Sequence, residues 1–404
     1  MGAADGFDVA VVGASLGGCT AARFYGLRGA RVALIEQRPD PGAWKVVCTH
    51  AIQSSAAPTI ERLGLAPLLE ERGAVRIAGE AWTPYGGWIH APADAPRGWG
   101  VTRKTLDPLL RSLAADTPGV ELMTGLTAVG LPGDGVAVAS RDGERSVVRA
   151  RLVVGADGRG STVARLAGVR GRVRPHGRFF YFAYWRGVRP EADLARIWLL
   201  DPDGGAHFPN EDGIALLAVA ATKAQLPAFR ADLERAYLDG LAALPDGPRL
   251  DGAERVSKIV GKIDMPNVIR PAAARGVAFV SDAALATDPL FGVGCGWAFQ
   301  SAEWLVDETA DALLDGGDLD AALRRYRRAF LRRLGPHHWQ IADYASGRPL
   351  RRNERALYRA GARDPVVNRA MEAMGSRRHS PLRALDPRLL PRLLRAQVSP
   401  GNSR

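Results

Sequence analysis

The sequence predicts an α/β fold that combines a parallel sheet with a second, mostly antiparallel sheet and a helical C-terminal tail. Apolar runs that read as buried strands end in acidic residues and glycines near residues 13, 157 and 282. Residues 170–257 alternate strand-like runs with turn signals such as the Asp-Pro-Asp-Gly-Gly run at 201–205. From Phe299 to Leu334 the pattern is helical, and we expect Pro336 to end that helix.

The first turn lies between an apolar strand at residues 8–12 and a helical run at residues 19–28. A second strand follows and ends at Glu36, about 20 residues after Gly13, as the βαβ layout requires. In this layout Gly13 permits a tight turn, Gly18 permits close packing of helix on strand, and Glu36 accepts a hydrogen bond from a ribose hydroxyl. The segment therefore predicts a Rossmann-like dinucleotide site, although Ser15 stands where the middle glycine of G-x-G-x-x-G is usual.

The two other turns are of the same kind. An apolar strand at residues 152–155 leads to Asp157 and Gly158, and another at residues 276–280 leads to Asp282. After Asp282 the chain supplies Pro289 and three glycines, at 292, 294 and 296, and then turns helical. A carboxylate and a glycine-rich turn at a helix N-terminus can hold a polyol and an anion, because the glycines let the backbone come close to the ligand.

In order, these three segments resemble the G-x-G-x-x-G, D-G and G-D motifs of FAD-dependent aromatic-ring monooxygenases of the para-hydroxybenzoate hydroxylase-like family. The wider superfamily includes geranylgeranyl reductases and flavin halogenases, and the resemblance covers residues 7–315. It implies a Rossmann-like FAD-binding domain of the GR2 type with a mostly antiparallel substrate domain. The implied boundaries are 1–76, 100–169 and 258–330 for the FAD-binding domain, 77–99 and 170–257 for the substrate domain, and 331–404 for a helical C-terminal region.

The turns and the resemblance together give the expected FAD contacts. Arg103 is carried over from an arginine that in the family stands before a matching helix, and Lys45 is a candidate partner of a phosphate. The expected set is Gly13, Ser15, Leu16, Gly18, Glu36, Gln37, Arg38, Lys45, Arg103, Asp157, Gly158, Asp282, Pro289, Gly292, Val293 and Gly294.

Four positions depart from the family pattern. The G-D pair reads Ser281-Asp282, and the histidine and asparagine usual further on are Leu285 and Gly296. In the D-G segment, Ala164 replaces an arginine. Asp282 and the backbone can still carry FAD.

Three residues are candidates for catalytic roles. Pro289 belongs to the segment that in the family passes beside the reactive edge of the flavin. Cys48 and His50 lie in a loop that in the superfamily runs close to the flavin or the substrate pocket, and a cysteine occurs in a similar loop of geranylgeranyl reductase-like members. Cys48 either tunes the flavin or serves a reductase, His50 is a candidate general acid or base, and both have the alternative role of packed loop residues. Asp288 is either a surface cap or a polar group near the flavin.

Composition sets the remaining expectations. The 47% hydrophobic and 24% charged content of the 404 residues is typical of a soluble globular chain, and no apolar run is long enough to span a membrane. The three cysteines, the polar N-terminus and the absence of metal-type spacing predict a cytoplasmic protein without a metal site. The net charge of +11 reflects arginine clusters after residue 320 that read as solvated helix faces, without a nucleic-acid motif. A monomer or a homodimer is compatible with these features.

The resemblance implies a monooxygenase that uses FAD, NAD(P)H and dioxygen on a hydrophobic aromatic or polyketide-like natural product, free or bound to a carrier. Two alternatives stay open: a FAD-dependent reductase or dehydrogenase of the geranylgeranyl reductase type, and a cyclase in which FAD is only a scaffold. The W-x-W-x-I-P segment of flavin halogenases is absent from the sequence, which argues against a halogenase.

Overall fold

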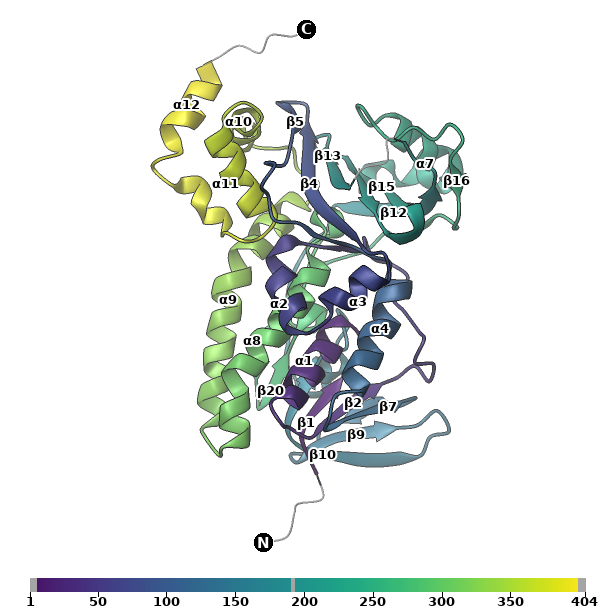
Figure 1. Ribbon diagram of the computed structural model, residues 1–404, viewed down its shortest axis with the longest axis vertical. Helices are drawn as coiled ribbons and strands as arrows, with labels where there is room; N and C mark the ends of the chain where they lie inside the picture. The colour runs from purple at the N-terminus through teal and green to yellow at the C-terminus, as the bar shows by residue number, and fades with distance from the viewer. Residues whose placement is uncertain (1–5, 190–192, 399–404) are drawn as a thin grey trace.

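The computed structural model describes residues 6–189 and 193–398. Residues 1–5 and 399–404, at the edges of the expected FAD-binding and C-terminal regions, and residues 190–192, inside the expected substrate domain, lie outside the described residues. One lobe contains a parallel sheet with its helices, and the other contains an antiparallel sheet flanked by α7 (Leu233–Ala242) and by the C-terminal helices (Figure 1). The α/β class expected from the sequence is confirmed.

The first sheet has the strand order β19-β20-β10-β1-β2-β7, and its pairings from β20 to β7 are parallel. Two more strands, β8 and β9, form an antiparallel meander with the first half of β10. The strands are β1 (Phe7–Val12), β2 (Val32–Glu36), β7 (Val120–Thr124), β8 (Thr127–Gly130), β9 (Gly135–Ala139), β10 (Arg145–Gly155), β19 (Ala273–Ala274) and β20 (Val277–Phe279).

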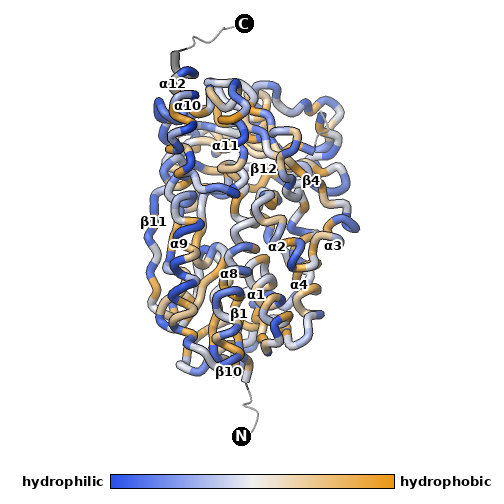
Figure 2. Tube along the Cα trace, turned by 60° about the vertical axis from the view of Figure 1, so that its left-hand side comes forward, coloured by the Kyte–Doolittle hydropathy of each residue, from blue (hydrophilic) through white to orange (hydrophobic). Residues whose placement is uncertain are grey.

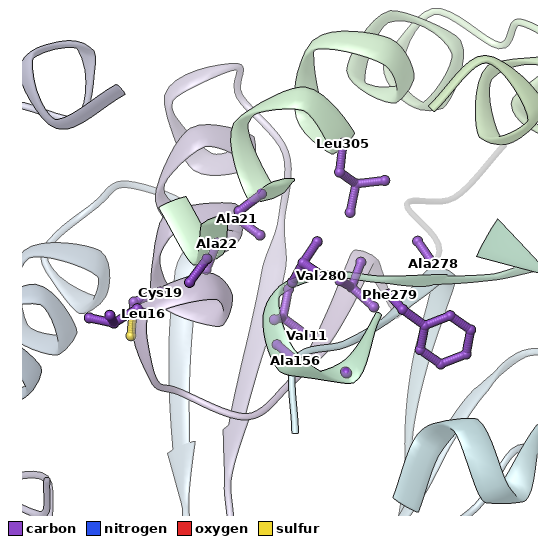
Figure 3. Packing of buried hydrophobic residues seen from close by; sticks show 14 of the residues in the cluster. Val11, Leu16, Cys19, Ala21, Ala22, Ala156, Ala278, Phe279, Val280 and Leu305 are labelled. Carbon is purple, nitrogen blue, oxygen red and sulfur yellow. The ribbon is translucent and has the colours of Figure 1, made fainter. Parts of the chain in front are cut away.

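Helices cover this sheet because its strands are apolar on both faces. All five residues of β2 are buried, as are Val9 to Val12 of β1. Side chains from α1, α8, β1 and β20 meet in one buried cluster (Figure 3). The helices of this lobe are α1 (Leu16–Leu27), α2 (Ala57–Arg62), α3 (Ala66–Glu71), α4 (Arg103–Ala115), α5 (Thr162–Leu166) and α8 (Gly294–Leu314).

The second sheet has the strand order β16-β12-β15-β14-β13-β4-β6-β3, with β5 beside β4 and β17 beside β12. Strand β12 follows the period of two: Phe180 and Phe182 belong to the cluster on one face, whereas Phe179 and Trp185 belong to the cluster on the other. The strands are β3 (Ala51–Ile52), β4 (Val75–Thr83), β5 (Gly87–Ile89), β6 (Gly98–Gly100), β12 (Arg178–Arg186), β13 (Leu194–Leu199), β14 (Gly204–Pro209), β15 (Ile214–Thr222), β16 (Glu254–Arg255) and β17 (Val260–Lys262).

A third sheet has three strands, in the order β11-β18-β21. Helix α6 (Leu226–Ala231) comes directly before α7 in the chain. The strands of the third sheet are β11 (Arg172–Arg174), β18 (Asn267–Ile269) and β21 (Leu285–Ala286). The C-terminal helices α10 (Arg352–Gly361), α11 (Pro365–Gly375) and α12 (Leu390–Val398) gather at the end of the molecule opposite β10 (Figure 2).

The expectation that Pro336 ends a helix is wrong. Helix α9 (Leu319–Tyr344) passes through Pro336, and the break in the expected 299–334 helix comes earlier, at residues 315–318 between α8 and α9. An internal proline costs a helix about 3 kcal/mol. Here buried side chains stand on both sides of it, Leu334 before and His337, Ile341 and Tyr344 after, so packing outweighs that cost. As a result α9 crosses the expected boundary at residue 330 and runs on toward the C-terminal helices (Figure 1).

Within the described part of the chain, no helix has the length and apolar character needed to cross a membrane.

Gly13 provides a test of how tightly this fold is packed. It has φ +107°, and a Cβ added there would lie 2.6 Å from the carbonyl oxygen of Ala156. Gly29 is the matched control, because it has φ +87° and an added Cβ would meet nothing within 4 Å. We expect Gly29→Ala to lower the free energy of unfolding by about 1 kcal/mol, the cost of a left-handed alanine. Gly13→Ala should cost roughly 3 kcal/mol, since it adds a clash with backbone.

Urea denaturation of both variants measures this difference. Equal losses at Gly13 and Gly29 would contradict the close approach of these two backbone segments.

Candidate functional site

The three acidic and glycine-rich turns meet at one cavity of about 500 Å³. Gly13, Asp157 and Asp282 all line it. The sheet register explains why: Val12 of β1 pairs with Gly155 of β10, which pairs with Phe279 of β20. Three parallel strands that end side by side place their following turns at one edge of the sheet, where ligands of such folds bind.

Glycines bring these turns into direct contact. A Cβ at Gly18 would lie 1.8 Å from the carbonyl oxygen of Gly13, and a Cβ at Gly17 would lie 2.8 Å from Cβ of Ser281. Gly18 does not line the cavity, so its part is close packing of α1 rather than contact with a ligand. Ser281 has φ +56°, the left-handed conformation that explains why glycine is usual there.

Glu36 closes the βαβ unit at the cavity wall. Its Oε2 accepts from the N–H of Ala14 at 2.9 Å, and its Oε1 accepts from the N–H of Arg38 at 3.0 Å. Each oxygen keeps a lone pair for a further donor. Since Gln37 and Arg38 also line the cavity, this end of it has the donors and acceptors expected for a ribose.

Cations surround Asp282 at the middle of the cavity. Nζ of Lys45 lies 3.2 Å from its carboxylate. Burial pushes the pKa of Asp282 upward, but Lys45 and Arg159 outweigh burial and hold that pKa below its ordinary value. Nη1 of Arg159 is buried without a hydrogen-bond partner among the described residues, on a side chain that lines the cavity. An anion such as a pyrophosphate is the missing partner for these groups.

Helix α4 holds the loop that carries Lys45, an arrangement that sequence reasoning missed. Asp107 accepts from the backbone N–H of Lys45 at 2.9 Å and from Nε of Arg103 at 2.6 Å. Arg111 donates to the carbonyl oxygens of Ala14 and Ala43, at 3.1 and 2.9 Å. Residues 103, 107 and 111 are charged at a spacing of four, so they share one helix face, and that spacing in an otherwise amphipathic helix was the available signal.

Arg103 is the first residue of α4. Its side chain is buried, its Nη2 donates to Oγ of Ser15 at 2.7 Å, and it lines the cavity. Burial alone would lower its pKa, but Asp107 and the nearby thiols raise it, so the guanidinium stays charged. Arg103 therefore joins the first turn to the loop of Cys48.

Two thiols face each other on the cavity wall. Sγ of Cys48 lies 3.5 Å from Sγ of Cys295, which belongs to the first turn of α8. The hydrogen bond between them lowers the pKa of Cys48 well below its ordinary value and raises that of Cys295. Arg103 lowers the pKa of Cys48 further. Cys48 is thus the thiolate of the pair and Cys295 the donor. Cys19, by contrast, is a core residue, and burial raises its pKa to about 12.

His50 is not among the residues that line the cavity, although Thr49 before it is. Its Nδ1 accepts from the backbone N–H of Arg103 at 2.7 Å, and its Nε2 contacts the hydroxyl of Tyr184. Burial lowers the pKa of His50, so the ring is neutral and Nε2 carries the proton. In this geometry His50 positions Arg103 and Tyr184, and a direct catalytic role for it remains only a sequence prediction.

The turn at Pro289–Phe291 closes the substrate side of the cavity. Asp288 before it is buried, which rules out a surface cap: its Oδ1 caps the turn at the N–H of Leu290 and its Oδ2 pairs with His176 at 2.6 Å. Pro289, Gly292, Val293 and Gly294 line the cavity. A Cβ at Gly294 would meet nothing within 4 Å, so the space in front of this backbone is open to a ligand.

These features fit FAD. Glu36 would hold a ribose, Lys45 and the buried, unpartnered Nη1 of Arg159 would face the pyrophosphate, and the open backbone at Gly294 would let a flavin ring approach closely. Among the expected contacts, Gly18 alone is a packing residue rather than a lining residue.

Arg159 tests the pyrophosphate position. We expect Arg159→Met to weaken FAD binding roughly ten- to hundred-fold, the loss typical of a charge-assisted hydrogen bond. Affinity for riboflavin, which has no phosphate, should stay within about twofold. Flavin fluorescence titration measures both, and Arg165→Met, an exposed arginine of α5, is the control. An equal loss for FAD and riboflavin would contradict the assignment.

Cys48 provides a second test. Because its pKa is lowered and those of Cys19 and Cys295 are raised, Cys48 should react with iodoacetamide before the other two thiols. Its alkylation rate should level off below pH 8.5, the approximate pKa of a free thiol. Cys295→Ala removes the donor, so the plateau should move to higher pH, whereas Cys19→Ala should leave it in place. Peptide mass spectrometry follows each site, and a profile like that of free cysteine would refute the pairing.

The chain is similar in sequence to a known protein family and to curated proteins. The family model described as FAD binding domain matches residues 6–229, more than half of the chain. Two curated relatives are digeranylgeranylglycerophospholipid reductases. That of Methanocaldococcus jannaschii is 33% identical over 174 residues, 42% of this chain and 43% of the relative, so this match spans less than half of either protein. That of Thermoplasma acidophilum is 25% identical over 348 residues, 82% of this chain and 85% of the relative.

Among solved structures, a flavoprotein/dehydrogenase of Cytophaga hutchinsonii has a TM-score of 0.77 at 15% identity, covering 92% of this chain and 93% of its own. Since it covers 92% of the chain, this likeness extends the shared fold beyond the residues that the family model matches. With the matched family model and a cavity that fits the cofactor, the chain belongs to the FAD binding domain family of oxidoreductases.

Proposed function

We propose that the protein is a FAD-dependent reductase of carbon–carbon double bonds in an apolar substrate, with NAD(P)H as the reductant. The observation that carries this proposal is the Cys48–Cys295 pair on the wall of the FAD cavity. A thiol beside the cofactor offers a proton to a carbon centre, a step that a reductase needs. The relative from Thermoplasma acidophilum, which aligns over most of both chains, is named as a reductase and supports this choice.

The cavity wall indicates what kind of substrate fits. Phe180 and Phe182 of β12 face the cavity, and Val47 and Met265 line it beside them. Among these four side chains there is no ionisable group, so this side favours hydrocarbon over polar ligands. An isoprenoid-like chain matches both this surface and the substrate class in the names of the curated relatives.

FAD, when bound, supplies transfer of a hydride from NAD(P)H to the organic substrate. The reaction consumes NAD(P)H, one proton and one double bond, and yields NAD(P)+ and two new C–H bonds. Cys295, the protonated thiol of the pair, gives the proton from Sγ, and Cys48 orients that thiol by accepting its hydrogen bond at 3.5 Å. A proton from solvent restores the thiol after turnover. The backbone from Pro289 to Gly294 positions the reacting edge, and the aromatic wall of β12 excludes water from it.

Oxygenation of an aromatic substrate is the second candidate, as the sequence resemblance implies. The observation in its favour is the pair of rings at Phe180 and Phe182, which present faces and edges on which a planar aromatic ring can stack opposite Pro289.

Turnover under argon separates the two reactions. With FAD-loaded protein, NADPH or NADH and geranylgeraniol as the probe, we expect NAD(P)H oxidation without oxygen and a product mass that rises by two hydrogens per reduced bond. A gain of one oxygen atom, seen only in air, would instead support the monooxygenase. Dithionite as an alternative electron donor shows whether a failure lies with NAD(P)H or with the substrate.

Cys295→Ser tests the proton donor in the same assay. We expect turnover to fall roughly 100-fold, the usual contribution of a positioned acid, while FAD affinity changes little. The exposed-surface variant Arg165→Met is the control for handling and folding. Unchanged turnover in Cys295→Ser would remove Cys295 from the reaction.

A further inference from the structure

A second cavity, of about 240 Å³, lies along the substrate sheet beside strands β4 and β13 and under helices α10 and α11. It is distinct from the FAD cavity, because Pro289 lines the first and Phe291, two residues later, lines the second. Its wall is mainly apolar, with Ile77, Ile197, Leu199, Phe208, Met371 and Met374.

Both carboxylates of this wall already have cationic partners. Glu80 pairs with His90 at 2.9 Å and with Arg196 at 3.5 Å. Glu372 pairs with Arg378. These acidic groups are therefore neutralised within the protein and do not call for a cationic ligand.

Arg377, in contrast, has no carboxylate partner among the described residues. Its Nη1 lies 3.4 Å from Nδ1 of His337 and 3.4 Å from the carbonyl oxygen of Met374, and its Nε is buried without a partner. Burial lowers the pKa of Arg377 to about 10, so it remains charged at neutral pH. Burial and Arg377 together lower the pKa of His337 to about 3, so the imidazole is neutral.

The backbone at this position is also unusual. Arg377 has φ +66°, a left-handed conformation that persists in residues other than glycine only where the surrounding structure enforces it. Here the end of α11 enforces it, because Arg377 follows the C-cap Ser376 and its N–H donates to the carbonyl oxygen of Met374 at 3.2 Å. The amide of Gln53 donates to the carbonyl oxygens of Phe291, at 2.8 Å, and Gly375, at 3.3 Å. The guanidinium consequently stands 5.3 Å from the ring centre of Phe291, at the cavity wall.

We propose that this cavity binds an amphipathic anion, with its carboxylate or phosphate paired to Arg377 and its hydrocarbon part along the apolar wall. A planar guanidinium with free N–H groups suits both head groups. No carboxylate of the described residues pairs with Arg377, and the ligand would supply that negative charge. The proposal concerns equilibrium binding, so it stands or falls independently of the reaction proposed above.

A series of ten-carbon probes tests the head group on the FAD-loaded protein by calorimetry. Decanoate and decyl phosphate should bind at least tenfold more tightly than decan-1-ol and methyl decanoate, which have the same chain without the charge. The tighter of the two anions identifies the head group. Equal affinities across the four probes would overturn the proposal on the native protein alone.

Variants then locate the charge. Arg377→Met should weaken binding of the anions roughly ten- to hundred-fold and change decan-1-ol binding by less than about threefold. Arg377→Lys should retain part of the preference. Arg369→Met, an exposed arginine of α11 that pairs with Asp94, should have no effect. An equal loss for anion and alcohol, or no loss for either, would show that Arg377 is only a packing residue.

Discussion

The close approach of the three turns near residues 13, 157 and 282 is the constraint on which the rest of the structure depends. In the first turn, an added Cβ at Gly13, Gly17 or Gly18 would meet Ala156, Ser281 or the turn itself at less than 3 Å. Because the three strands end in register, this contact is what brings Asp157 and Asp282 to one cavity. Larger residues at these positions would push the turns apart. The ligand-binding edge of the parallel sheet would then be disrupted before the packing of its core.

The second requirement is a loop held in place by charge. Residues 41–50 have little regular structure, and α4 fixes them through Asp107 and Arg111, which bond their backbone. The same helix places Arg103 against Ser15. The cation Lys45 and the thiol of Cys48, both on the cavity wall, are therefore positioned by one rigid element.

Local patterns predicted the parts of the site that local sequence determines. Glycine and acid after an apolar strand identified all three turns, and the order of those turns predicted their meeting. Contacts between distant segments left no such pattern: Cys48 and Cys295 are 247 residues apart, and Asp282 meets Lys45 across 237. The prediction that Pro336 ends a helix failed for the opposite reason. Proline locally favours the end of a helix, but tertiary burial of Leu334 and Ile341 outweighs this preference.

The turn Pro289–Phe291 joins the two cavities physically. Pro289 faces the cofactor site, Phe291 faces the cavity of Arg377, and Gln53 ties Phe291 to the end of α11. An anion at Arg377 would contact the ring that is two residues from the flavin-facing backbone. Since that backbone is one short 3₁₀ turn capped by the buried Asp288, a shift of Phe291 cannot leave Pro289 unmoved. The C-terminal helices, which lie outside the matched family segment, thereby form part of the wall of the second cavity, on the other side of this turn from the first.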